Sequence, residues 1–218
     1  QKGGVGKTST ATALASIFAQ RGYRTLIIDC DQQCNTTDTY RAETEGVATI
    51  YDVLLDESRI SISEAIQHTE CGEILAGDSL LRQADEKLKG CVDGLYRMAD
   101  ALEKCGDYDY IFIDVNPAPG WSHYLSLSVS DHAVVVMLPD IASLEGNKGI
   151  LETIEEIRGT TNPSLDILGF LFNKNNSRTV LAKQVTDAAA AMAAQADTRI
   201  FDTKIRSAVV LSENVLAH

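Results

Sequence analysis

The chain has 218 residues, of which 44% are hydrophobic and 23% charged, and this is enough for one sizeable α/β domain with its own core. The formal net charge of −12 excludes a surface that is basic all over, although it leaves room for one local basic patch. Five scattered cysteines without a CxxC pair favour free thiols in a cytosolic protein over a disulfide framework. No apolar run is long enough to cross a bilayer, so we expect no stable membrane insertion.

Segments with helical and strand-like patterns alternate along the chain, which is typical of a parallel sheet with helices on both faces. We expect helices at residues 8–21, 50–55 and 62–66, a long helical stretch within 80–105, and helices at 144–158 and 180–195. We expect strands at residues 24–31, 109–115, 132–139 and 165–174, a short last strand at 198–203, and a further element beginning at 211. The pattern therefore predicts an α/β fold of three layers, α-β-α, around a mostly parallel central sheet.

Polar side chains stand where several of these strands end. Asp29 and Asp31 close one strand, Asp114 closes the next, and Asn173 closes a third. Because ligands of open parallel sheets bind beyond the carboxyl ends of the strands, we expect these side chains to line one crevice. The glycine-rich start of the chain is expected to enter the same crevice.

That start, "QKGGVGKTST", is close to the phosphate-binding pattern G-x-x-x-x-G-K-[ST]. Gly6, Lys7 and Thr8 satisfy its end, whereas Gln1 stands where the first glycine is usual. Glycines allow backbone N–H groups to point inward at a phosphate, and the helix that follows adds the positive end of its dipole. We expect Lys7 to reach the β- and γ-phosphates and the Thr8 hydroxyl to bind Mg²⁺. The predicted nucleotide-binding residues of this loop are Gly3, Gly4, Val5, Gly6, Lys7, Thr8 and Ser9.

A phosphate-binding loop of this kind (a P-loop) lies between a strand and a helix, yet no strand precedes Gln1 in this sequence. We therefore expect a native segment of about six to ten residues, rich in Ile, Val and Ala, ahead of Gln1. The ending "LSENVLAH" likewise enters a helical element with nothing after it. The sequence is interpreted as a single P-loop NTPase domain, residues 1–218, truncated at both ends and lacking its first strand.

The lysine at position 2 is not part of the generic pattern. "KGGVGKT" resembles the deviant Walker A motif of the family that includes the ParA-type partition ATPases, MinD and the nitrogenase iron protein. The resemblance implies that Lys2 reaches across a dimer interface to the phosphates of the partner's nucleotide, whereas Lys7 acts within its own subunit. A solvated loop lysine is the alternative interpretation of Lys2.

The segment "IIDCDQQCNTTD" resembles the second signature of the family, D-x-D-P-Q-G-N. Asp29, Asp31, Gln33 and Asn35 match it, whereas Gln32 and Cys34 replace the usual proline and glycine. The resemblance implies that Asp31 positions the attacking water and contributes to the Mg²⁺ site. A strand-end aspartate that caps the following turn is the alternative for Asp31 and, more so, for Asp29.

The segment "YDYIFIDVNPAPG" resembles the Walker B strand and its switch loop, which implies that Asp114 serves Mg²⁺ through a water. Val115 and Asn116 depart from the family pattern there. In "GFLFNK", the resemblance implies that Asn173 contacts the adenine base, with local hydrogen bonds as the alternative. In "FDTKIR", Asp202 and Thr203 are expected to line the far side of the adenine pocket.

Two further segments, "LPDIASLEGNKGILETI" and "FDTKIRSAVVLSEN", resemble the ParA-type branch. That branch implies an ATP hydrolase that dimerises on ATP, binds DNA non-specifically, and is stimulated by a ParB-like centromere-binding protein in a cytoplasmic, nucleoid-associated setting. The predicted DNA-binding residues are Lys204 and Arg206, with Arg178 and Lys183 as weaker candidates, and a solvated basic cluster is the alternative.

Three other functions remain open from the residues. A MinD-like membrane-positioning ATPase would need a C-terminal amphipathic helix. A weakly catalytic, ATP-dependent regulator would carry the same motifs. An electron-transfer protein like the nitrogenase iron protein would need cysteines beside the switch loop, and the segment after Asp114 has none.

Overall fold

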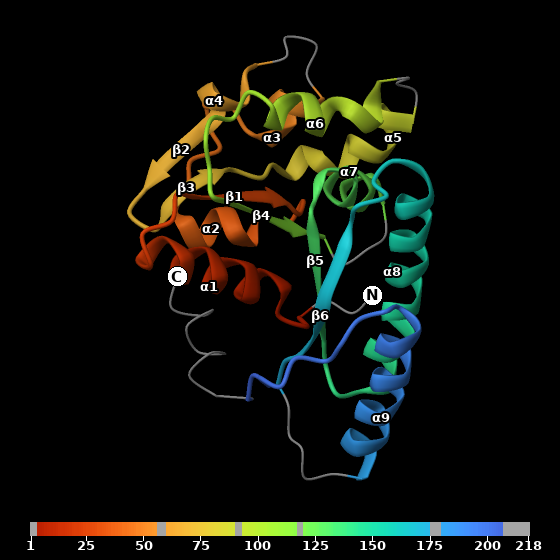
Figure 1. Cartoon of the computed structure of the whole chain (residues 1–218). Coiled ribbons are helices and arrows are strands. Elements are labelled where there is room, and N and C mark those ends of the chain that lie inside the picture. Colours follow the sequence, from red (N-terminus) through yellow and green to blue (C-terminus); the bar gives the residue numbers. More distant parts are fainter. Residues whose placement is uncertain (1–3, 56–59, 90–92, 117–119, 175–179, 207–218) are drawn as a thin grey trace. The chain divides into compact units, whose positions relative to one another are not determined.

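Figure 1 shows the computed structural model of the chain, which describes residues 4–55, 60–89, 93–116, 120–174 and 180–206. The chain divides into two compact units. The larger unit consists of residues 7–129, and the smaller unit joins residues 4–6 to the chain from residue 130 onward.

The sheet of the larger unit has the strand order β2-β3-β1-β4. Its strands are β1 (Thr25–Cys30), β2 (Ile66–Thr69), β3 (Gly72–Leu75) and β4 (Tyr110–Val115). β1 pairs in parallel with β3 and β4, and β2 forms an antiparallel hairpin with β3. The register of β1 and β4 sets Asp29 directly opposite Asp114, so both carboxylates come to the same end of the sheet.

Helices cover both faces of this sheet, because its central strand is apolar on both sides. On one face, Ile27 of β1 packs in a cluster with residues of α1 (Lys7–Gln20) and α2 (Asn35–Tyr40). On the other face, Leu26 and Ile28 belong to a larger hydrophobic cluster. That cluster draws residues from α3 (Ile50–Leu54), α4 (Ile62–Ala65), α5 (Ala84–Lys89), α6 (Arg97–Leu102) and α7 (Trp121–Val129). Two short 3₁₀ turns, Ser79–Gln83 and Gly94–Tyr96, precede α5 and α6.

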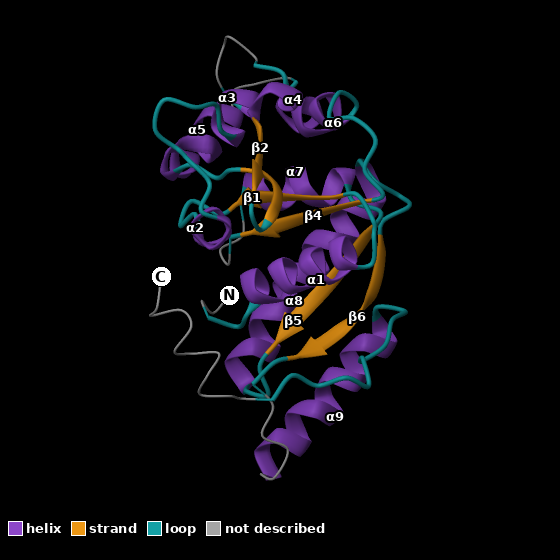
Figure 2. Cartoon of the chain, turned by 90° about the vertical axis from the view of Figure 1, so that its left-hand side faces the viewer, coloured by secondary structure: helices purple, strands orange, loops and turns teal. Residues whose placement is uncertain are grey.

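The smaller unit contains the parallel pair β5 (His132–Met137) and β6 (Asp166–Phe172), with α8 (Ile141–Thr160) and α9 (Val180–Gln195), as Figure 2 shows. Helix α8 begins with an N-cap, because the Asp140 carboxylate accepts a hydrogen bond from the Ser143 N–H at 2.7 Å. In the described part of the chain, no helix is both long enough and apolar enough to span a membrane.

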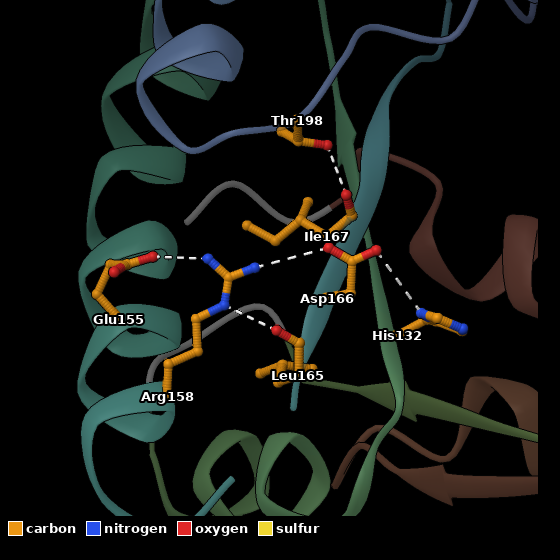
Figure 3. Close-up of polar contacts among 7 residues, drawn as sticks. All are labelled: His132, Glu155, Arg158, Leu165, Asp166, Ile167 and Thr198. Atoms are coloured by element: carbon orange, nitrogen blue, oxygen red, sulfur yellow. Dashed lines mark hydrogen bonds and ion pairs between the residues drawn. The ribbon is translucent and has the colours of Figure 1, made fainter. Parts of the chain in front are cut away.

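Arg158 fixes the connection from α8 to β6 (Figure 3). Its Nε donates to the Leu165 carbonyl at 2.7 Å, its Nη1 meets Glu155 at 2.9 Å, and its Nη2 lies 3.8 Å from Asp166. The bond to the carbonyl satisfies a backbone group at the entry of β6, so Arg158 is a structural residue.

The predicted fold class is confirmed: the chain is α/β and its strands are mostly parallel. The long helical stretch expected within residues 80–105 is present in part, since the 3₁₀ turn Ser79–Gln83 runs directly into α5 and the turn Gly94–Tyr96 runs directly into α6. The expected strand at 198–203 is wrong, because only Ile200 forms a bridge, to Phe170. The sequence interpretation missed α2, β2, β3 and α7.

Candidate functional site

The end of the P-loop is joined to the end of β4 by a hydroxyl–carboxylate contact. The Thr8 hydroxyl donates to Asp114 Oδ2 at 2.7 Å, and the Thr36 hydroxyl donates to the same oxygen at 2.8 Å. Asp114 is 2% exposed, and burial raises its pKa while the two hydroxyl donors oppose that rise. Two of the groups predicted to serve Mg²⁺ are thus in direct contact.

Lys7, the first residue of α1, lies near two carboxylates. Burial lowers the pKa of Lys7, and the nearby charges of Asp114 and Asp31 act in the opposite direction. A cation between carboxylates at a helix N-terminus is an arrangement that binds a phosphate together with a divalent cation.

Asp31 organises the turn after β1. It is 5% exposed, and its Oδ1 accepts a hydrogen bond from the Gln33 N–H at 3.0 Å. In the part of the chain that the structure describes, no hydrogen bond is made to its other oxygen, Oδ2. The turn closes through the Cys34 N–H, which donates to the Asp31 carbonyl at 2.9 Å.

Cys34 is the N-cap residue of α2 and has left-handed backbone angles, φ 54° and ψ 28°. This is the position where the resembled family usually has glycine, and the backbone geometry that favours glycine is therefore kept. Burial raises the pKa of the Cys34 thiol to about 12.

Asp29 has a structural role, as the capping alternative predicted. It is fully buried and accepts three hydrogen bonds, from the Asp31 N–H at 3.0 Å, the Thr37 N–H at 2.9 Å and the Thr37 hydroxyl at 2.7 Å. Thr37 in turn accepts from the Gly77 N–H at 2.7 Å. Burial raises the pKa of Asp29 to about 6, although these donors oppose the rise. Asp29 therefore holds β1, α2 and the end of β3 together.

Asn173 supports the first part of the P-loop within the smaller unit. Its Nδ2 donates to the Val5 carbonyl at 2.8 Å, and its Oδ1 accepts from the Lys174 N–H at 2.8 Å. Lys174 Nζ donates to the Gly4 carbonyl at 3.2 Å. Asn173 is 7% exposed, so its predicted contact with adenine stays a prediction, while the local hydrogen bonds of the alternative are present.

The segment after α9 runs beside β6. The Ile205 N–H donates to the Phe172 carbonyl at 2.9 Å, and the exposed residues Asp202, Thr203 and Lys204 lie between this bond and the Ile200 bridge. Asp202 and Thr203 thus stand near the carboxyl end of β6, the strand that Asn173 follows.

Some of the remaining predicted site residues are described by the structure and others are not. Lys183 on α9 and Arg206 are exposed, and Ser9 is exposed in the first turn of α1. Lys2, Gly3 and Arg178 lie outside the described residues.

Sequence reasoning missed Thr36, Thr37 and Gly77. The first two are hydroxyl residues in the "NTTD" run directly after the acidic signature, and that run was the available signal. The sequence offers no signal for Gly77, because this residue matters through the lack of a side chain. A Cβ at this position would lie 2.9 Å from Asp29 Cγ.

The described residues contain no group of three or more His, Cys, Asp or Glu side chains placed to hold a metal ion by themselves. Mg²⁺ usually keeps several waters and takes one or two carboxylates plus substrate phosphates, so the Thr8–Asp114 pair suits this ion. A glycine-rich loop entering α1, a lysine at the helix start and an acidic strand end define a P-loop nucleotide-binding fold.

Comparison with known proteins gives the family. A family model described as an AAA domain matches residues 1–167. The chromosome partitioning protein ParA of Caulobacter vibrioides is 33% identical over 98% of this chain and 80% of that protein. The chromosome-partitioning ATPase Soj of Thermus thermophilus is 34% identical over 98% of this chain and 81% of that protein. The chain belongs to the ParA/Soj family of P-loop ATPases within this AAA-domain group.

A solved structure agrees with this fold. The cobyrinic acid a,c-diamide synthase of Mycobacterium smegmatis, with bound ADP and magnesium, is 28% identical and has a TM-score of 0.80. The similarity covers 87% of this chain and 78% of that one.

Proposed function

We propose that this chain is a partition ATPase, which binds ATP with Mg²⁺, dimerises in that state, binds DNA without sequence preference and hydrolyses ATP when a ParB-like partner stimulates it. The observation that carries the nucleotide part is the 2.7 Å hydrogen bond from Thr8 to Asp114, with Lys7 beside the same carboxylate. Similarity to ParA and Soj supports partition over the synthase activity named for the M. smegmatis structure, because the former relatives are more similar in sequence and match 98% of the chain.

In the proposed reaction, the backbone N–H groups of Gly4 to Gly6 and the Lys7 ammonium hold the phosphates. Thr8 and Asp114 would hold Mg²⁺, which would supply charge neutralisation for the phosphoryl group. Asp31 orients the attacking water through Oδ2, the oxygen that its turn leaves unused. Positioning contributes more than basicity here, because the phosphoryl transition state is loose.

Dimerisation is proposed to depend on Lys2, which completes the partner subunit's phosphate site. The Lys2→Ala variant should keep ATP binding and lose dimer formation and stimulated hydrolysis. Analytical ultracentrifugation with ATP and Mg²⁺, alongside calorimetry, separates the two effects. Loss of ATP binding with dimerisation unchanged would contradict the cross-subunit role.

The charge distribution supports a DNA-binding surface on the smaller unit. Residues 7–129 contain ten basic and twenty acidic residues, whereas the rest of the chain contains nine basic and eleven acidic. Residues 174–206 contain six basic and three acidic residues. Most of the chain's negative net charge therefore belongs to the larger unit, whereas Lys204, Arg206 and Lys183 belong to the smaller unit and are exposed and suited to phosphate contacts.

Co-sedimentation with DNA tests this proposal, with ATP, ADP and no nucleotide at two salt concentrations. We expect the protein to bind DNA in the presence of ATP, and not with ADP or without nucleotide. The Lys204→Ala/Arg206→Ala variant should weaken it and lower the slope of log K against log salt by about 2, since each phosphate contact contributes about 0.9. The matched control, Arg21→Ala/Lys104→Ala, removes two exposed charges from the larger unit and should bind like the parent. Binding to anionic liposomes in place of DNA would support a MinD-like function instead.

A further inference from the structure

A cavity of about 170 Å³ lies within the larger unit, lined by residues of α3, α5, α6 and α7 among others. Its floor is apolar. Ile50, Leu54, Leu88, Met98 and Leu125 line it, and each is at most 4% exposed. The pocket opens to solvent, since its lining includes the exposed residue Arg82, so a ligand can reach these buried apolar side chains.

The cavity wall also contains polar groups, from Gln32, Arg82, Asn116 and Ser122. Arg82 is exposed and lies in the last turn of a short 3₁₀ helix. Within the residues that the structure describes, no carboxylate or carbonyl pairs with its guanidinium. An apolar chamber with a few polar groups at its margin is the usual form of a small-molecule site.

Size and charge restrict the ligand. A dry apolar cavity of about 150 Å³ accommodates benzene, so this one has room for an aromatic ring or a short aliphatic chain. Arg82 favours an anion, whereas the acidic excess of the larger unit, ten basic against twenty acidic residues, disfavours a polyanion such as a second nucleotide. A single carboxylate on a small apolar body satisfies both conditions.

The cavity also adjoins the residues of the candidate site. Its wall includes Cys30 and Gln32, the two neighbours of Asp31 in the chain, and Asn116, which stands two residues after Asp114. A ligand here would contact the backbone segments that position both carboxylates, without competing for the phosphate site.

We infer that this cavity is a binding site for a small amphipathic monocarboxylate, whose apolar body lies among the floor residues and whose carboxylate is bound by Arg82. Binding at this site does not depend on nucleotide, so it can be tested apart from the proposed ATPase function.

Phenylacetate is a suitable probe, with phenylacetamide and phenethylamine as neutral and cationic analogues of the same shape. Trp121, the single tryptophan of the chain, stands next to Ser122 and reports occupancy by its emission, and ligand-observed NMR provides a second signal. We expect saturable phenylacetate binding with a Kd on the order of 1 mM, from the size of the ligand. Phenylacetamide should bind about three- to tenfold more weakly, and phenethylamine more weakly still.

Two variants assign the site. Arg82→Gln should weaken phenylacetate about three- to tenfold and leave phenylacetamide unchanged, whereas Arg21→Gln, an exposed charge elsewhere on the same unit, should change neither. Ser122→Phe should fill the chamber and abolish binding of both, provided that its thermal unfolding stays cooperative. The inference is overturned if phenylacetate shows no saturable binding to the parent protein by either signal, or if Arg82→Gln binds phenylacetate as the parent does.

Discussion

Alanine substitutions at two glycines of the P-loop should have very different effects. Gly4 has φ +76° and Gly6 has φ +93°, both in the region that side chains rarely adopt. A Cβ on Gly4 would meet nothing within 4 Å, whereas a Cβ on Gly6 would lie 1.9 Å from Asn173 Nδ2. An alanine would therefore strain the backbone at both positions, but it would clash with another side chain only at Gly6.

The magnitudes follow from these contacts. A left-handed backbone costs a non-glycine residue about 1 to 2 kcal/mol, and this is all that Gly4→Ala should lose. Gly6→Ala must also displace the Asn173 side chain, which breaks its bonds to the Val5 carbonyl and the Lys174 N–H. Each buried polar group left unsatisfied costs about 1 to 3 kcal/mol, so with two such groups and the backbone term the total loss should be about 3 to 8 kcal/mol.

Urea denaturation followed by circular dichroism measures both variants. Gly6→Ala and Asn173→Ala each lose the same two hydrogen bonds, and the double variant loses them only once. The loss in the double variant should therefore be smaller than the sum of the two single losses by about 2 to 6 kcal/mol. Equal losses for Gly4→Ala and Gly6→Ala, or strict additivity in the double variant, would refute the proposed support of the loop by Asn173.

Three further substitutions test the surrounding structure. Asp29→Ala should lower the free energy of unfolding by about 2 to 4 kcal/mol, because Thr37 and the following turn lose a buried acceptor, and chemical denaturation that shows under 1 kcal/mol would argue against this role. Arg158→Ala should lower the free energy of unfolding by about 1 to 2 kcal/mol, and Glu155→Ala by at most about 0.5 kcal/mol, because the exposed ion pair contributes less than the bond to the Leu165 carbonyl. Equal losses of stability in calorimetry would contradict that ranking. Cys34→Gly should raise stability by about 0.5 to 1 kcal/mol through relief of the left-handed backbone, and a lower melting temperature would contradict the assignment.

The parts of the fold with long apolar periodicity were predictable from sequence. The helix at 180–195 and the strands at 25–30 and 110–115 agree with the structure to within a residue or two, because burial alone dictates their patterns. The hairpin of β2 and β3 was not predictable in this way, since "IQHT" and "GEIL" are four residues each and their pairing is decided by packing beside β1.

The position of a candidate-site residue was predictable where that residue lies at a strand end, as for Asp114, whose role at Mg²⁺ stays a prediction. A residue's role was not predictable where it depends on contacts between distant segments. Asp29 matches a family signature but serves as a buried acceptor for Thr37, and Asn173 reaches back 168 residues to the Val5 carbonyl. The Asn173 bond follows from tertiary packing and leaves no local pattern, whereas Thr37 lies only eight residues after Asp29, in the "NTTD" run. The strand expected before Gln1 and the role of Lys2 stay predictions.

A calorimetric titration with ATP, with and without Mg²⁺, tests the central claim most directly. The account predicts saturable binding near one ATP per chain that is strengthened by Mg²⁺, and an Asp114→Asn variant that still binds ATP but has lost most of the Mg²⁺ enhancement. No heat of binding for ATP with Mg²⁺, or an unchanged Mg²⁺ enhancement in Asp114→Asn, would contradict the assignment of the P-loop and its Thr8–Asp114 pair as a nucleotide and metal site.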